Sequence, residues 1–154
     1  MECRISVRRC CVQLLTLVAI TLIAQASLAE RAVVLVTDKD SPIDELTTLD
    51  IRKAYLGIAV TIDGRSVRAL RMRNDERLNQ IFMQSVIAMS LRSYERRLLS
   101  LALKYGRPRP TEVGSLQELS RMIVENSPSI GYMWKSDAES DSRVKIIKVL
   151  WQEP

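Results

Sequence analysis

The chain has 154 residues, of which 47% are hydrophobic and 27% are charged, and its formal net charge is +5. This composition is typical of one soluble globular domain. The sequence contains no histidine, which excludes the serine–histidine and cysteine–histidine pairs of nucleophilic catalysis.

The N-terminal segment has the three parts of a secretory signal peptide. A positively charged start precedes an apolar run over residues 12–24, and small residues follow at Ser27 and Ala29. The positive charges are Arg4, Arg8 and Arg9. We predict that residues 1–29 are cleaved and that the mature protein is periplasmic or secreted, with no membrane span. The alternative is an uncleaved segment that anchors the domain by its N-terminus, also outside the cytoplasm.

Residues 30–154 are therefore predicted to form one domain, which is the 125 residues left when 29 are removed from 154. The three cysteines, Cys3, Cys10 and Cys11, all lie in the predicted signal peptide. The mature domain then has neither cysteine nor histidine, so we predict no disulfide, no metal site of the Cys/His kind and no cofactor. Its net charge is +3, from 20 basic and 17 acidic residues. A mildly basic, exported domain is not expected to bind nucleic acid.

The first half of the mature chain predicts two strands and a helix. Residues 32–37 form a continuous apolar run, which indicates a strand buried on both faces, as in parallel α/β sheets. Thr47 is placed to cap a short helix that Gly57 ends. Asp63-Gly64 predicts a tight turn into a second strand over 67–72, in which arginines are interleaved.

The second half predicts three helices and then two strands. The helices are expected over 78–89, over 91–102 with Ser90 as its cap, and from the capping box Ser115–Glu118 to about 126; residues 106–110 are a rigid loop. The strands are expected over 130–134 and 144–150, with a polar, acidic loop over 136–142 between them. The order β-α-β-α-α-α-β-β predicts a single α/β domain with a mixed or parallel sheet.

Four segments in order resemble the phosphate-binding proteins of ABC transporters, in the type 2 periplasmic-binding-protein superfamily. They are Val34–Asp38 running into Ser41–Thr47, Leu49–Gly57 followed by Asp63-Gly64, Met89-Ser90 with Tyr94, and Ser127–Tyr132. The resemblance implies a single lobe of that fold, with a mixed, mostly parallel sheet flanked by helices in three layers. It also implies a non-catalytic domain that recognises a small, phosphate-like anion at the start of the helix after the second strand.

Two departures from this family are visible in the sequence. A full binding protein closes two lobes on its ligand, and 125 residues hold only one lobe, so hinge closure is not available. The family's Gly-Ser-Gly-Thr anion cradle is also absent, because the chain reads Arg71-Met-Arg-Asn-Asp-Glu-Arg77 there. Asp75 and Glu76 place carboxylates at the helix start, where they repel an anion.

Five residues are candidates for a ligand site, and each also has a structural alternative. They are Ser41, Arg71, Arg73, Asn74 and Tyr132. The alternatives are a turn at Ser41, solvated strand positions for the arginines or pairing of Arg73 with Asp75 or Glu76, a helix cap at Asn74, and a core or groove-wall position for Tyr132. No catalytic residue is assigned.

Two functions remain open at this point. The first is a solute-binding-like domain that recognises a small anion. The second is a periplasmic protein-interaction or sensory accessory domain that has lost ligand binding, whose partner is an envelope protein or a second copy of the chain.

Overall fold

A five-stranded mixed sheet forms the centre of the computed structural model, which describes residues 31–153. The sheet order is β5-β4-β6-β1-β7. The strands are β1 (Ala32–Asp38), β4 (Arg68–Met72), β5 (Thr111–Val113), β6 (Ser129–Trp134) and β7 (Val144–Gln152). The predicted signal peptide lies outside the described residues.

Strand β1 is the one strand of this sheet that runs against the others. Strands β5, β4 and β6 are mutually parallel, whereas β1 pairs antiparallel with both β6 and β7. The predicted mixed, mostly parallel sheet is therefore confirmed. The inference that the buried run over 32–37 has parallel neighbours was wrong, because burial on both faces only requires a helical layer on each side.

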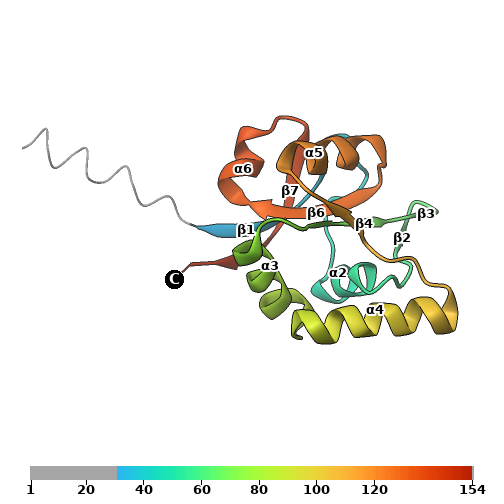
Figure 1. The fold of residues 1–154 in the computed structure, drawn as a ribbon. Coiled ribbons are helices and arrows are strands. Elements are labelled where there is room, and N and C mark those ends of the chain that lie inside the picture. The colour runs from blue at the N-terminus through green and yellow to red at the C-terminus, as the bar shows by residue number, and fades with distance from the viewer. Residues whose placement is uncertain (1–30, 154) are drawn as a thin grey trace, which may run out of the picture. The chain divides into compact units, whose positions relative to one another are not determined.

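Helices cover both faces of the sheet and give three layers (Figure 1). One face carries α5 (Leu116–Glu125) and α6 (Lys135–Ser140). The other carries α2 (Thr48–Tyr55) and α3 (Glu76–Phe82), which continues as the π-helical turn η2 (Met83–Ile87). Helix α4 (Leu91–Tyr105) lies outside α2.

Local signals placed several element ends correctly. The side chains of Thr47, Ser90 and Ser115 each accept a backbone N–H at the start of α2, α4 and α5. Asp63 and Gly64, with φ of 50° and 74°, turn β2 (Thr61–Ile62) into β3 (Arg65–Ser66). Two successive residues at positive φ are what a type I′ hairpin requires.

Three predicted segments differ from the structure. The acidic loop over 136–142 contains α6, which has no side-chain cap and buries only Ala138. Strand β5 was missed, because it has three residues and buries only Val113. One buried residue is too few to produce a hydrophobic periodicity. The helix predicted over 78–89 ends earlier, because η2 closes at Ala88 in a left-handed conformation with φ of 56°.

An aromatic cluster in the core joins the helices to the sheet beneath the candidate site. The rings of Phe82 and Tyr132 stack at 3.9 Å between centroids, and Tyr55 packs on Phe82 at 4.6 Å. The hydroxyl of Tyr55 donates to the carbonyl of Leu70, and that of Tyr94 donates to the carbonyl of Tyr55. These contacts connect α4, α2 and α3 with β4 and β6.

Candidate functional site

The candidate site is the edge of the sheet where the three parallel strands end. Strand β4 leads into α3, β5 into α5 and β6 into α6, so three helix starts gather at this edge. Ligands of open α/β sheets bind outside the carboxyl ends of the strands. The connecting residues 73–75 and 114–115 are therefore the first place to look for a binding function.

The carboxylate of Asp75 fills the start of α3. Its Oδ1 accepts the backbone N–H of Leu78 at 2.9 Å, which makes Asp75 the N-cap of the helix. Its Oδ2 accepts the indole N–H of Trp134, at the end of β6, at 2.8 Å. The protein thus places its own carboxylate where the resemblance puts an anionic ligand.

A second carboxylate closes the neighbouring connection. The backbone N–H of Gly114 donates to Oε2 of Glu118 at 2.7 Å, and the N–H of Glu118 donates to Oγ of Ser115 at 3.2 Å. The side-chain amide of Asn74 donates to the carbonyl of Gly114 at 2.8 Å and ties the two connections together. The cap alternative for Asn74 was wrong, because Asp75 takes that position.

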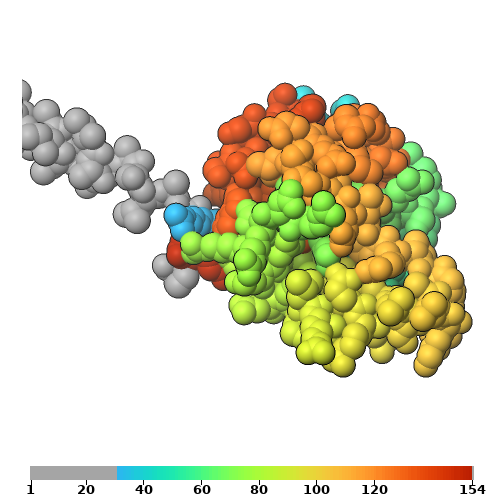
Figure 2. Space-filling view, viewed as in Figure 1, coloured from blue at the N-terminus to red at the C-terminus, as the bar shows by residue number. Residues whose placement is uncertain are grey.

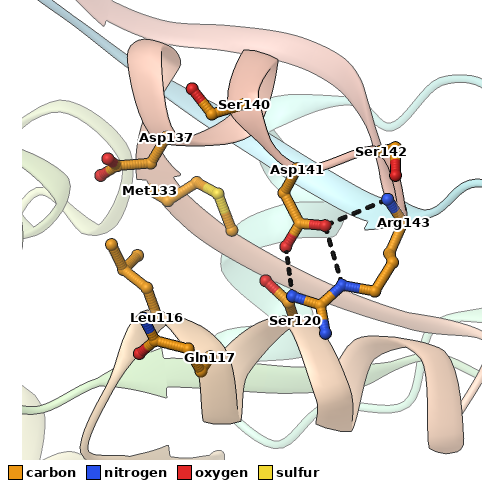
Figure 3. A pocket seen from close by; sticks show the side chains of 9 residues that line it. All are labelled: Leu116, Gln117, Ser120, Met133, Asp137, Ser140, Asp141, Ser142 and Arg143. Atoms are coloured by element: carbon orange, nitrogen blue, oxygen red, sulfur yellow. Dashed lines mark hydrogen bonds and ion pairs between the residues drawn. The ribbon is translucent and has the colours of Figure 1, made fainter.

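A polar hollow of about 300 Å³ lies beside this edge, between α5 and α6 (Figure 3). Arg143 lies against Asp141, with its Nη2 2.7 Å from Oδ2, and this ion pair is the main reason that the pKa of Asp141 is lowered. The pKa of Asp137 is raised, first by burial and then by the charge of Asp75. With Arg143 neutralised by Asp141, the carboxylate of Asp137 leaves the hollow negatively charged.

Arg71 is buried and its charge is balanced within the fold. Its guanidinium contacts Glu95 of α4 at 2.7 Å and Glu112 of β5 at 2.5 Å. It also lies 5.6 Å from the ring centre of Tyr94. Burial disfavours the charge of Arg71, but the hydrogen bond and charge of Glu95, with the charge of Glu112, outweigh it and raise its pKa. Two carboxylates therefore occupy the positions that an anion needs on this guanidinium.

Arg73 is the exposed arginine at the start of α3. Its backbone N–H donates to the carbonyl of Val113 at 2.9 Å, which joins the ends of β4 and β5. The guanidinium makes no hydrogen bond or ion pair within the described part of the chain, so the predicted pairing with Asp75 or Glu76 is not formed. It borders a groove of about 290 Å³ between α3 and the start of α4.

The structure does not bring Ser41 to this edge. Strand β1 runs opposite to β6, with Thr37 beside Ile130 and Val33 beside Trp134. The loop after β1 therefore lies at the far end of the sheet from Asp75. Ser41 is buried there, and its Oγ accepts the N–H of Ile43 at 3.3 Å, which is the turn alternative.

Tyr132 is wholly buried in the core. Its hydroxyl donates to Oδ1 of Asn79 at 2.5 Å, and its ring is stacked on Phe82. Burial raises its pKa well above the usual range of tyrosine. Among the five candidate residues, the edge itself contains Arg73 and Asn74.

The sequence reading anticipated a carboxylate at the start of α3 but missed the partner of Asp75. Trp134 lies at the end of the strand predicted over 130–134, and nothing in the sequence links positions 75 and 134, which are 59 residues apart. Glu118 was identified as half of a capping box, yet its side chain reaches Gly114 rather than Ser115.

Residues 31–153 contain no group of three or more Asp, Glu, His or Cys side chains arranged to hold a metal ion. None of the helices described is long and apolar enough to cross a membrane.

No protein-family model and no curated protein matches this sequence. Solved structures do match. An ABC-type phosphate transport receptor from Vibrio cholerae aligns with a TM-score of 0.58 and 15% identity, over 79% of this chain and 47% of that chain. PstS from Borrelia burgdorferi aligns with a TM-score of 0.58 and 16% identity, over 82% of this chain and 50% of that chain.

These alignments establish the fold. The described residues share an α/β fold with part of these phosphate-transport proteins, and the chain spans about half of their length. At this level of identity the likeness is one of architecture. What the domain binds depends on its own residues.

Proposed function

We propose that this chain is an exported, non-catalytic solute-binding-like domain that has lost phosphate binding at the sheet edge and acts as an accessory domain for another protein of the cell envelope. The observation that carries the proposal is the position of Asp75. Its carboxylate accepts both the N–H of Leu78 in the first turn of α3 and the indole N–H of Trp134. A phosphate can bind at the same place only if it displaces the carboxylate of Asp75, which is part of the chain.

The electrostatics of the edge support the loss of anion binding. The edge contains three acidic side chains, those of Asp75, Glu118 and Asp137. The pKa of Asp137 is raised by burial and by the negative charge of Asp75. Arg71, the buried cation nearest to the end of β4, is paired with two carboxylates. An incoming anion therefore meets negative charge and a neutralised arginine.

Residues 31–153 belong to one compact unit. The proteins it matches are about twice as long as the part that aligns. Capture of a solute by closure needs two surfaces that move toward each other. The described unit supplies one of these surfaces, so we infer that the other contact comes from outside it, from a partner protein or a second copy of the chain.

Calorimetric titration with phosphate tests the proposal. The wild-type protein, purified as its cells export it, is expected to give no binding heat at phosphate concentrations up to about 1 mM. Asp75→Asn removes the negative charge at the start of α3 and keeps a side-chain oxygen as the helix cap. Glu139→Gln, on the exposed surface of α6, makes the same change of charge elsewhere and is the matched control. Phosphate binding by the wild type tighter than about 0.1 mM contradicts the proposal.

A second candidate function rests on Arg73. Its exposed guanidinium makes no hydrogen bond or ion pair with any residue from 31 to 153 and stands at the start of α3. Recognition of a small carboxylate or sulfate there, rather than phosphate at Asp75, is expected to disappear in Arg73→Ala and to persist in Arg65→Ala, which removes an exposed arginine of β3. Equal heats from both variants exclude this candidate.

A further inference from the structure

The outward side of α4 carries an unusual concentration of apolar and basic side chains. Exposed large hydrophobic residues on this helix are Leu91, Leu99, Leu103 and Tyr105, which is half of the eight found among the described residues. Leu103 is 78% exposed and Leu99 is 51% exposed. The helix turns a different side to the core, where Tyr94, Leu98 and Leu101 are buried.

Four residues form a straight row on the outward side. Arg92, Arg96, Leu99 and Leu103 follow one another at steps of four, three and four residues, which places them on one line along a helix. The row is about 16 Å long at 1.5 Å per residue. Arg97 and Lys104 lie about a third of a turn around the helix from the row, both on the same side. We call these six residues the α4 outer face.

The cations of the α4 outer face are not neutralised by the fold. Within residues 31–153, Arg92, Arg96, Arg97 and Lys104 make no ion pair or side-chain hydrogen bond. The single acidic residue of the helix, Glu95, points away from the row and holds Arg71 and Arg109. The face therefore carries four positive charges with no carboxylate among them.

The arrangement in space leaves this face open. Figure 1 shows α4 as the outermost helix on its side of the sheet, and Figure 2 shows it, in yellow, along an outer edge of the molecule. A flat surface can approach the whole row at once. Gly106 then ends the helix in a left-handed conformation, which limits the row to this length.

We propose that the α4 outer face binds the surface of an anionic phospholipid bilayer. Leucines next to cations match the boundary of headgroups and acyl chains, where a cation contacts lipid phosphate and a leucine enters just below it. A protein interface usually gathers its apolar anchors at the centre of a polar rim. The α4 outer face instead places its two leucines at one end of the row and two arginines at the other, and mobile lipid headgroups can adjust to each cation.

Vesicle flotation tests this proposal with the exported protein as it is purified. The vesicles contain phosphatidylcholine alone or with one lipid in three replaced by phosphatidylglycerol. The wild type is expected to bind the anionic vesicles at least about tenfold more strongly than the neutral ones, and to release them as salt rises. Absence of wild-type binding to anionic vesicles overturns the proposal.

Matched variants locate the binding on α4. Arg92→Glu with Arg96→Glu is expected to lower the partition coefficient about tenfold or more. Arg121→Glu with Lys135→Glu makes the same change of charge on α5 and α6, on the other face of the sheet, and is expected to change it less than about twofold. Residues 1–30 are identical in all these proteins, so the difference reports α4. Equal losses in the two double variants overturn the proposal.

A second pair of variants tests the apolar part. Leu99→Ser with Leu103→Ser keeps the charge of the helix and is expected to weaken binding about tenfold. Leu49→Ser with Val124→Ser removes two other exposed apolar side chains and serves as its control. Circular dichroism melting verifies that all variants are folded. Binding of the wild type to polyglutamate but not to anionic vesicles assigns the face to an acidic protein and overturns the lipid proposal.

Discussion

Arg71→Met is the substitution that best separates a structural arginine from a ligand-binding one. The guanidinium is buried between Glu95 and Glu112, and methionine keeps much of its volume without the charge. Removing one partner of a buried ion pair usually destabilises by about 3–5 kcal/mol, because the remaining charge is left uncompensated. Here the side chains of Glu95 and Glu112 are 33% and 39% exposed, and Arg109 still contacts Glu95.

Partial exposure of the two carboxylates lowers the expected loss. Water solvates the carboxylates once Arg71 is gone, so we expect a decrease of about 2 kcal/mol in the free energy of unfolding. Urea unfolding followed by circular dichroism measures it, and the midpoint is expected to fall by about 1 M. A double-mutant cycle with Glu112→Gln is expected to give a coupling energy of about 1 kcal/mol.

The opposite result has a clear meaning. If Arg71→Met changes stability by less than about 0.5 kcal/mol and the cycle shows no coupling, then Arg71 is not held by the two carboxylates. The guanidinium is then available to an anion, and the structural argument made for this residue is wrong. The structural argument is also wrong if Arg71→Met lowers anion affinity without lowering stability.

Three further predictions concern stability. Gly131→Ala places a Cβ 2.9 Å from Cδ1 of Leu119, so we expect overpacking to destabilise by about 1–3 kcal/mol in urea unfolding, and a neutral effect contradicts the close approach. Ser115→Ala removes the N-cap of α5 and is expected to lower stability by about 1 kcal/mol, with faster hydrogen exchange in the first turn of the helix. Burial raises the pKa of three tyrosines, so their contribution to stability is complete below about pH 10, where unfolded tyrosine ionises, and is lost as the pH rises further. The three residues are Tyr55, Tyr94 and Tyr132. Their tyrosinate absorbance is expected to appear together with the loss of circular dichroism as the pH rises. Ionisation of these rings while the protein is still folded contradicts the prediction.

The elements that sequence reasoning placed well are those with a local cause. Thr47, Ser90 and Ser115 cap helices with contacts three residues away, and Asp63-Gly64 needs only its own backbone angles. Segments without a strong local signal were misplaced. Strand β5 pairs with β4 at the edge of the sheet, and α6 lies in the crossover that connects β6 with β7, which runs in the same direction.

By itself, the sequence determined the class of fold and the presence of a carboxylate at the start of α3, since periodicity and caps depend on near neighbours. The tertiary structure alone decided the direction of β1, which places Ser41 at the far end of the sheet from Asp75. It also decided that Arg71 is neutralised by Glu95 and Glu112 from separate elements. Strand direction and charge pairing depend on residues distant in the chain, and a single sequence carries no local trace of them.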